Sequence, residues 1–141
     1  MSPRAASFLR LLARVELRAL AAVLLVSAGV AACMFVVARR TPGSLLPAGD
    51  WAKLAGLYAA VIGTPLAAAF GAPAYALLRW KGIASWPLVL GLGAVPGLVT
   101  FLGVGPSDSL GGWVLASGVA VAALTHVLSR TKAPAAASDQ A

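Results

Sequence analysis

The fold of this chain is decided by residues 54–78, LAGLYAAVIGTPLAAAFGAPAYALL, which are 25 consecutive positions without Asp, Glu, Lys or Arg. About 20 residues of α-helix span the ~30 Å hydrocarbon core of a bilayer. In lipid a backbone of this length must be helical, because each N–H and C=O group needs an internal partner. The stretch therefore predicts a transmembrane helix over 52–78.

Three further uncharged runs of similar length, 19–38, 82–107 and 109–129, predict helices over 17–38, 83–104 and 110–128. Only 11% of the 141 residues are charged and 60% are hydrophobic, which leaves too few charges to cover the surface of a soluble domain. We therefore expect an all-α polytopic membrane protein with four transmembrane helices in an antiparallel bundle. Residues 1–130 form its single domain, and residues 131–141 are a disordered tail.

The basic residues stand at the ends of the apolar runs, so the net charge of +7 is better explained by membrane topology than by a nucleic-acid partner. With the N-terminus inside, the inner side holds eight of them and the outer side three. These are Arg4, Arg10, Arg14, Arg18, Arg79, Lys81, Arg130 and Lys132 against Arg39, Arg40 and Lys53. The imbalance predicts an N-in, C-in protein of a bacterial inner membrane, with the lipid bilayer as its first partner.

Four tryptophans lie within a few residues of a predicted helix end, as expected of side chains that anchor a helix at the membrane interface. They are Trp51, Trp80, Trp86 and Trp113. Residues 2–18 form a basic amphipathic segment before the first helix. This segment either extends that helix or lies on anionic lipid or a partner.

Small residues recur at helical spacing in the second predicted helix and predict a packing seam. The seam consists of Gly56, Ala60, Gly63, Thr64, Ala67, Ala68, Gly71 and Ala72. It either packs within the monomer or also joins monomers. The chain therefore has itself or another membrane protein as a possible partner.

Internal prolines predict kinks at Pro65, Pro73 and Pro96, because each ring removes an N–H and displaces the carbonyl four residues earlier. Such kinks are either simple bends or the lining of a transport site. Each predicted helix also carries one hydroxyl near its middle, and the four hydroxyls either converge or bond within their own helices. They belong to Ser27, Thr64, Thr100 and Ser117.

Charged residues stand only at the ends of the predicted spans, where Arg18 and Lys53 are each the second residue of theirs, so a charged coupling site within the membrane is not expected. Cys33 and His126, the single cysteine and histidine, fall near opposite faces of the membrane and cannot form a nucleophile pair. Residues 30–33, VAAC, are compatible with a lipoprotein cleavage site, but the apolar run continues beyond Cys33 and favours an unprocessed cysteine. The sequence therefore predicts no enzymatic activity and no catalytic, metal or cofactor residues.

The segment 71–91, with GAPAYALLR at 71–79 followed by Trp86 and Gly91, resembles small uncharacterised bacterial four-helix membrane proteins. The resemblance implies the four-helix fold and assigns no functional residue. From the residues themselves we expect an accessory or assembly protein that acts through helix–helix contacts. The alternative is a small oligomeric channel or transporter with its pathway at the two kinked helices.

Overall fold

The computed structural model describes residues 3–41, 43, 45–104 and 109–130. Its elements are α1 (Pro3–Arg40), α2 (Ala48–Leu66), the π-helical turn η1 (Ala67–Gly71), α3 (Ala72–Trp80), α4 (Trp86–Val104) and α5 (Ser109–Arg130). No β-strand occurs in the described ranges. The predicted tail, residues 131–141, lies outside them.

Four helical stretches of the described residues are long and apolar enough to cross a membrane. The candidate spans are Ala6–Arg40, Ala48–Trp80, Trp86–Gly103 and Gly111–Arg130. The second span joins α2, η1 and α3 end to end. The all-helical fold and the four candidate spans agree with the sequence, whereas the helix bounds differ from those predicted at several ends.

The largest difference is in α1, which is one helix of 38 residues and therefore about 57 Å long. Of the two interpretations of residues 2–18, the structure bears out the one in which they extend the first helix, because from Pro3 onward they belong to α1. No proline or glycine interrupts the chain between Pro3 and Gly29, so nothing ends the helix before the apolar run. The charged residues of the candidate span Ala6–Arg40 stand in its first half and at its end, and the run 19–38 between them is uncharged.

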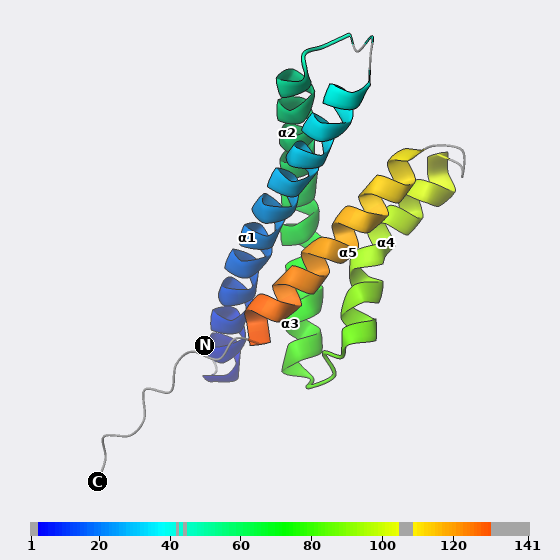
Figure 1. The fold of residues 1–141 in the computed structure, drawn as a ribbon. Helices are drawn as coiled ribbons and strands as arrows, with labels where there is room; N and C mark the ends of the chain where they lie inside the picture. The colour runs from blue at the N-terminus through cyan, green and yellow to red at the C-terminus, as the bar shows by residue number, and fades with distance from the viewer. Residues whose placement is uncertain (1–2, 42, 44, 105–108, 131–141) are drawn as a thin grey trace, which may run out of the picture.

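Successive spans run in opposite directions and form two helical pairs, α1 with α2 and α4 with α5 (Figure 1). We call the end with the start of α1, α3 and the last turn of α5 the basal end, and the end with the α1–α2 connection the distal end. The pairs lie together at the basal end and separate toward the distal end (Figure 1). The α4–α5 pair also ends before the α1–α2 pair does.

The buried core lies at the basal end, where α1, α3 and α4 meet. It consists of Val15, Ala19, Ala72, Tyr75, Ala76 and Val89, surrounded by Phe8, Leu11, Leu12, Leu92 and Ala122. The first turns of α1 therefore pack against the other helices, and this part of the chain does not form a separate helix lying along the membrane surface.

A glycine turn ends α3 and reverses the chain into α4. Gly82 has a φ of +72°, a conformation that glycine adopts without strain. Its N–H donates to the carbonyl of Arg79, and the N–H of Ile83 donates to the carbonyl of Leu78, which is the Schellman pattern of a helix end. The turn places Trp80 and Trp86 at the same end of the molecule.

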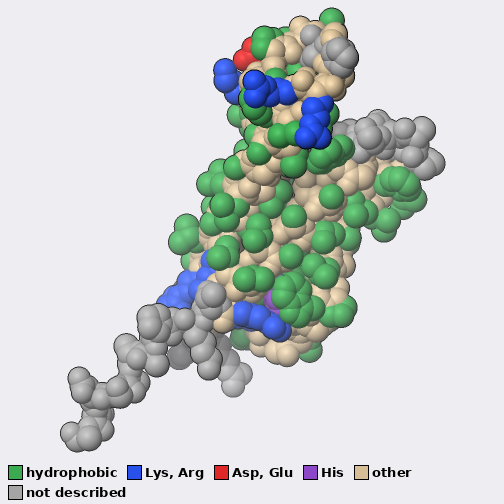
Figure 2. All heavy atoms as spheres, viewed as in Figure 1, with side chains coloured by type: hydrophobic (Ala, Val, Ile, Leu, Met, Phe, Trp, Pro, Cys, Tyr) green, Lys and Arg blue, Asp and Glu red, His purple; other side chains and the backbone are tan. Residues whose placement is uncertain are grey.

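Basic side chains gather toward the two ends of the bundle, and apolar side chains cover the face between them (Figure 2). The basic residues of the basal half whose side chains the structure describes are Arg10, Arg14, Arg18, Arg79, Lys81 and Arg130. At the distal end Arg39, Arg40 and Lys53 stand with Asp50, whose carboxylate lies 3.2 Å from the ammonium of Lys53.

Candidate functional site

The small residues of α2 lie against α1. A Cβ at Gly56 would stand 3.0 Å from the Cβ of Ala31, and a Cβ at Gly63 would stand 3.2 Å from a methyl group of Val23. A side chain at either position would crowd α1, where Ala31 or Val23 would have to shift by a few tenths of an ångström. The structure therefore brings Gly56 and Gly63 of the predicted seam into an intramolecular contact.

The π-turn changes which later residues belong to this contact. Ala67, Ala72 and Ala76 are buried, at spacings of five and four residues, whereas Ala68 and Gly71 are half-buried. The N–H of Ala72 donates to the carbonyl of Ala67, five residues earlier. Without this wider turn, the row of small residues at spacing four would continue through Ala68. Ala60 and Thr64, also predicted, are half-buried.

Pro73 explains the wide turn. It has no N–H to donate to the carbonyl of Ala69, and its ring crowds that carbonyl, so the chain takes a longer turn just before it. Pro65 and Pro96 instead lie inside the continuous helices α2 and α4.

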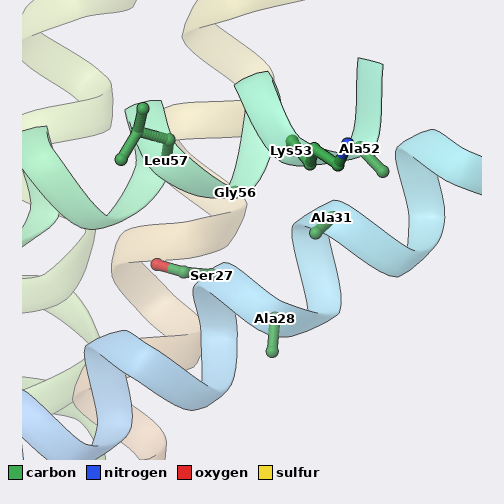
Figure 3. A pocket seen from close by; sticks show the side chains of 7 residues that line it. All are labelled: Ser27, Ala28, Ala31, Ala52, Lys53, Gly56 and Leu57. Carbon is green, nitrogen blue, oxygen red and sulfur yellow. The ribbon is translucent and has the colours of Figure 1, made fainter. Parts of the chain in front are cut away.

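A shallow depression lies between α1 and α2 toward the distal end, lined by Ser27, Ala28, Ala31, Ala52, Lys53, Gly56 and Leu57. Figure 3 shows the Ser27 side chain extending from α1 into the space between the two helices. Most of the lining residues are small, so the depression follows from the same residues that allow α1 and α2 to approach. It contains one charged group, the exposed Lys53, which pairs with Asp50.

The closest helix contact joins α4 to α5 and depends on glycines that the sequence did not single out as a seam. A Cβ at Gly93 would lie 2.5 Å from both the carbonyl oxygen of Gly118 and the Cβ of Ala122. A Cβ at Gly97 would overlap the backbone of Leu115. Gly93 and Gly97 are four residues apart, the spacing that lets two membrane helices pack backbone to backbone.

Hydroxyl groups of α4 and α5 donate to carbonyls of their own helices. The Thr100 hydroxyl donates to the carbonyl of Pro96 at 2.9 Å, and the Thr125 hydroxyl donates to that of Val121 at 2.8 Å. Ser27 is buried between α1 and α2, while Thr64 and Ser117 are half-buried. Thr100 is thus satisfied locally, four residues from its acceptor.

A buried polar contact at the basal end links α3 to α5. The Tyr75 hydroxyl and Nδ1 of His126 form a hydrogen bond of 3.0 Å, and both residues are at least 96% buried. The His126 ring also meets the Trp86 ring edge-on, with centroids 4.6 Å apart, and the Arg130 guanidinium lies 5.7 Å from the centre of Trp86. Tyr75, His126, Trp86 and Arg130 form what we call the basal aromatic cluster.

Two further polar atoms of the cluster region are buried, Nε2 of His126 and the hydroxyl oxygen of Ser129. Neither has a hydrogen-bond partner among the described residues. Because the imidazole is enclosed on all sides, its evident role is to join helices. The described residues contain no group of three His, Cys, Asp or Glu side chains placed to hold a metal ion.

The sequence placed His126 near a face of the membrane, and the structure buries it against Tyr75. One signal for this contact was present. Tyr75 precedes Arg79 by four residues, and His126 precedes Arg130 by four residues. If both basic residues mark the same membrane face, Tyr75 and His126 lie at the same depth.

The four tryptophans are distributed unevenly. Trp80 contacts Phe8 with ring centroids 5.4 Å apart, and Trp86 belongs to the basal aromatic cluster. Trp51 lies in the first turn of α2 at the distal end, and Trp113 lies in α5 at the tip of the shorter helical pair. Cys33 is exposed on the distal half of α1, far along the bundle from His126.

No protein-family model, curated protein or solved structure matches this chain. The resemblance of residues 71–91 therefore stays a prediction.

Proposed function

We propose that this protein crosses a bacterial cytoplasmic membrane four times, with the basal end of the bundle facing the cytoplasm. The support is the charge distribution: six described basic residues stand in the basal half with Glu16, and three stand at the distal end with Asp50. Basic residues flanking membrane helices stay preferentially in the cytoplasm.

Reporter fusions test this topology. Alkaline phosphatase is active outside the cytoplasm, so we expect activity when it is fused after Leu45, between α1 and α2, and little when it is fused after Arg130. The reversed pattern would contradict the proposed orientation.

Within that membrane we propose an accessory or assembly role, exerted through α2. None of the 19 residues of α2 is buried. The helix packs on α1 along one face, while the pair α4–α5 diverges from it (Figure 1). Its outward face presents large apolar side chains, Leu54, Leu57, Tyr58, Val61 and Ile62, each at least 40% exposed.

Tyr58 is the observation that favours a protein partner over lipid. Its side chain is 64% exposed, and its hydroxyl forms no hydrogen bond with another described residue. Two residues before it, Gly56 abuts Ser27 and Ala31 of α1, near the middle of the uncharged run 19–38. Hydrocarbon offers no acceptor, and an unmade hydroxyl hydrogen bond there is unfavourable.

We therefore infer that the exposed face of α2 binds another transmembrane helix that carries a hydrogen-bond acceptor opposite Tyr58. This shifts the proposed contact away from the small-residue seam, since Gly56 and Gly63 of that seam are occupied by α1. Helix–helix hydrogen bonds in membranes contribute roughly 0.6–1.7 kcal/mol.

Substitution of Tyr58 by Phe tests this inference, because it removes the hydroxyl alone. We expect association, measured by native gel electrophoresis of the full chain in mild detergent, to weaken roughly threefold to tenfold. Coexpression of two differently tagged copies shows whether the partner is a second copy.

The matched control is Tyr75→Phe, which removes the other tyrosine hydroxyl from a buried position. Tyr75→Phe is expected to lower stability and leave association intact, whereas Tyr58→Phe is expected to weaken association and leave stability unchanged. A complex of unchanged strength in Tyr58→Phe would reject the role of α2.

The channel or transporter alternative is not favoured by a specific contact. The hydroxyls of Thr100 and Thr125 are used within their own helices, and the depression between α1 and α2 is shallow and mostly apolar in lining.

A further inference from the structure

A row of three arginines runs along an outward face of α1. Arg10, Arg14 and Arg18 are spaced by four residues and so share one side of the helix. Arg10 and Arg14 are exposed and Arg18 is half-buried. The adjoining side, with Val15 and Ala19 one position after Arg14 and Arg18, is buried in the core, so the row runs beside the packed face of α1.

Among the described residues, no carboxylate forms an ion pair with this row. The ion pair that the described residues do form joins Lys53 to Asp50 at the distal end. Glu16 is two positions from Arg14 and from Arg18, and residues at that spacing do not face each other on a helix. The row is therefore a set of guanidinium groups available to an external anion.

The same face becomes apolar immediately beyond the arginines. Leu17, Leu24 and Leu25 are 71%, 62% and 58% exposed, and they follow Arg10 and Arg14 at spacings that keep them on one face. Arg14 to Leu25 covers eleven residues, or about 16 Å along the helix. One leaflet of the hydrocarbon core is about 15 Å thick.

Charge and length together fit one kind of molecule. A phosphate diester binds between guanidinium groups, which match its geometry better than ammonium groups do. Acyl chains of one leaflet would cover the leucines. We propose that this face of α1 binds an anionic glycerophospholipid of the cytoplasmic leaflet, with its phosphate at Arg14 and Arg18 and its acyl chains along Leu17, Leu24 and Leu25.

The site is independent of the α2 face, and it places the membrane boundary on α1 at residues 14–18. The core residues Tyr75 and His126 then lie near the lipid headgroups, and Arg79, Trp80 and Arg130 lie beyond them on the cytoplasmic side. The first turns of α1 project from the bilayer as part of the basal four-helix core.

Native mass spectrometry of the full chain in detergent, titrated with phosphatidylglycerol or phosphatidylcholine of equal chain length, tests the proposal. We expect the first phosphatidylglycerol to bind several-fold more tightly than phosphatidylcholine. In R14Q/R18Q the affinity for phosphatidylglycerol falls by roughly tenfold or more, because each basic residue near a membrane surface contributes about 1 kcal/mol.

The matched control is R79Q/K81Q, which removes the same charge from the same end on another helix and is expected to change the affinity less than twofold. Glycerol 3-phosphate, which has the phosphate without acyl chains, should not displace the lipid. Equal losses in the two double variants, displacement by glycerol 3-phosphate, or no preference in the unchanged protein would each overturn the proposal. If R14Q/R18Q does not fold, R14Q alone should still weaken binding several-fold.

Discussion

Substitution of Gly97 by Ala is expected to destabilise the protein more than the same substitution at any other helical glycine. The new Cβ would overlap the backbone of Leu115, and no side-chain rotation relieves a clash with backbone. The helices α4 and α5 would have to move apart over the stretch in which Gly97 meets Leu115 and Gly93 meets Gly118. We expect a loss of about 3 kcal/mol, the upper part of the range for overpacked cores.

Unfolding by sodium dodecyl sulfate in mixed micelles measures this loss. Trp86 and Trp113 report it, since each stands on one of the two helices. The matched control is Gly91→Ala on the same helix, where a Cβ meets nothing within 4 Å and the expected change is within about 0.5 kcal/mol. Equal stability of the two variants would show that α4 and α5 are not in backbone contact.

His126→Ala is expected to have the second large effect. The imidazole is 2% exposed, contacts the Trp86 ring and bonds the Tyr75 hydroxyl. Its removal leaves a cavity and an unpartnered buried hydroxyl, for an expected loss of about 3 kcal/mol. Tyr75→Phe alone leaves Nδ1 of His126 without its partner and is expected to cost about 1–2 kcal/mol.

The double variant separates the hydrogen bond from the packing. If the bond is made, Tyr75→Phe costs less in the His126→Ala background than in the unchanged protein, by about 1 kcal/mol. Tyr58→Phe, at an exposed position, should leave the unfolding free energy unchanged. Strictly additive effects of Tyr75→Phe and His126→Ala would rule out the hydrogen bond.

The sequence predicted the four spans because a membrane helix requires an uncharged run of about 20 residues, and the length of such a run can be read directly from the sequence. It left open whether residues 2–18 extend the first helix or lie on lipid or a partner. The structure shows the extension, because charge does not end a helix and the apolar residues Leu11, Leu12 and Val15 pack into the core.

Contacts between helices were less accessible to sequence analysis. The alanine- and glycine-rich composition offers many small-residue rows, and spacing alone does not say which neighbour each row meets. The π-turn before Pro73 then shifts the second half of the seam by one residue. Gly93 and Gly97 carry the signature of close packing, but the adjacent Pro96 suggested only a kink. The Tyr75–His126 bond joins residues 51 positions apart, and only the relative depth of Arg79 and Arg130 pointed to it.

Site-specific photocrosslinking in the native membrane tests the proposed role of α2 most directly. A photoreactive side chain at Val61, on the exposed face of α2, is compared with one at Val99, which is equally exposed on α4. We predict a crosslinked product of discrete mass from position 61, weakened by Tyr58→Phe, and none from position 99. Products that are the same from both positions, or their absence at position 61, would contradict an assembly role for this helix.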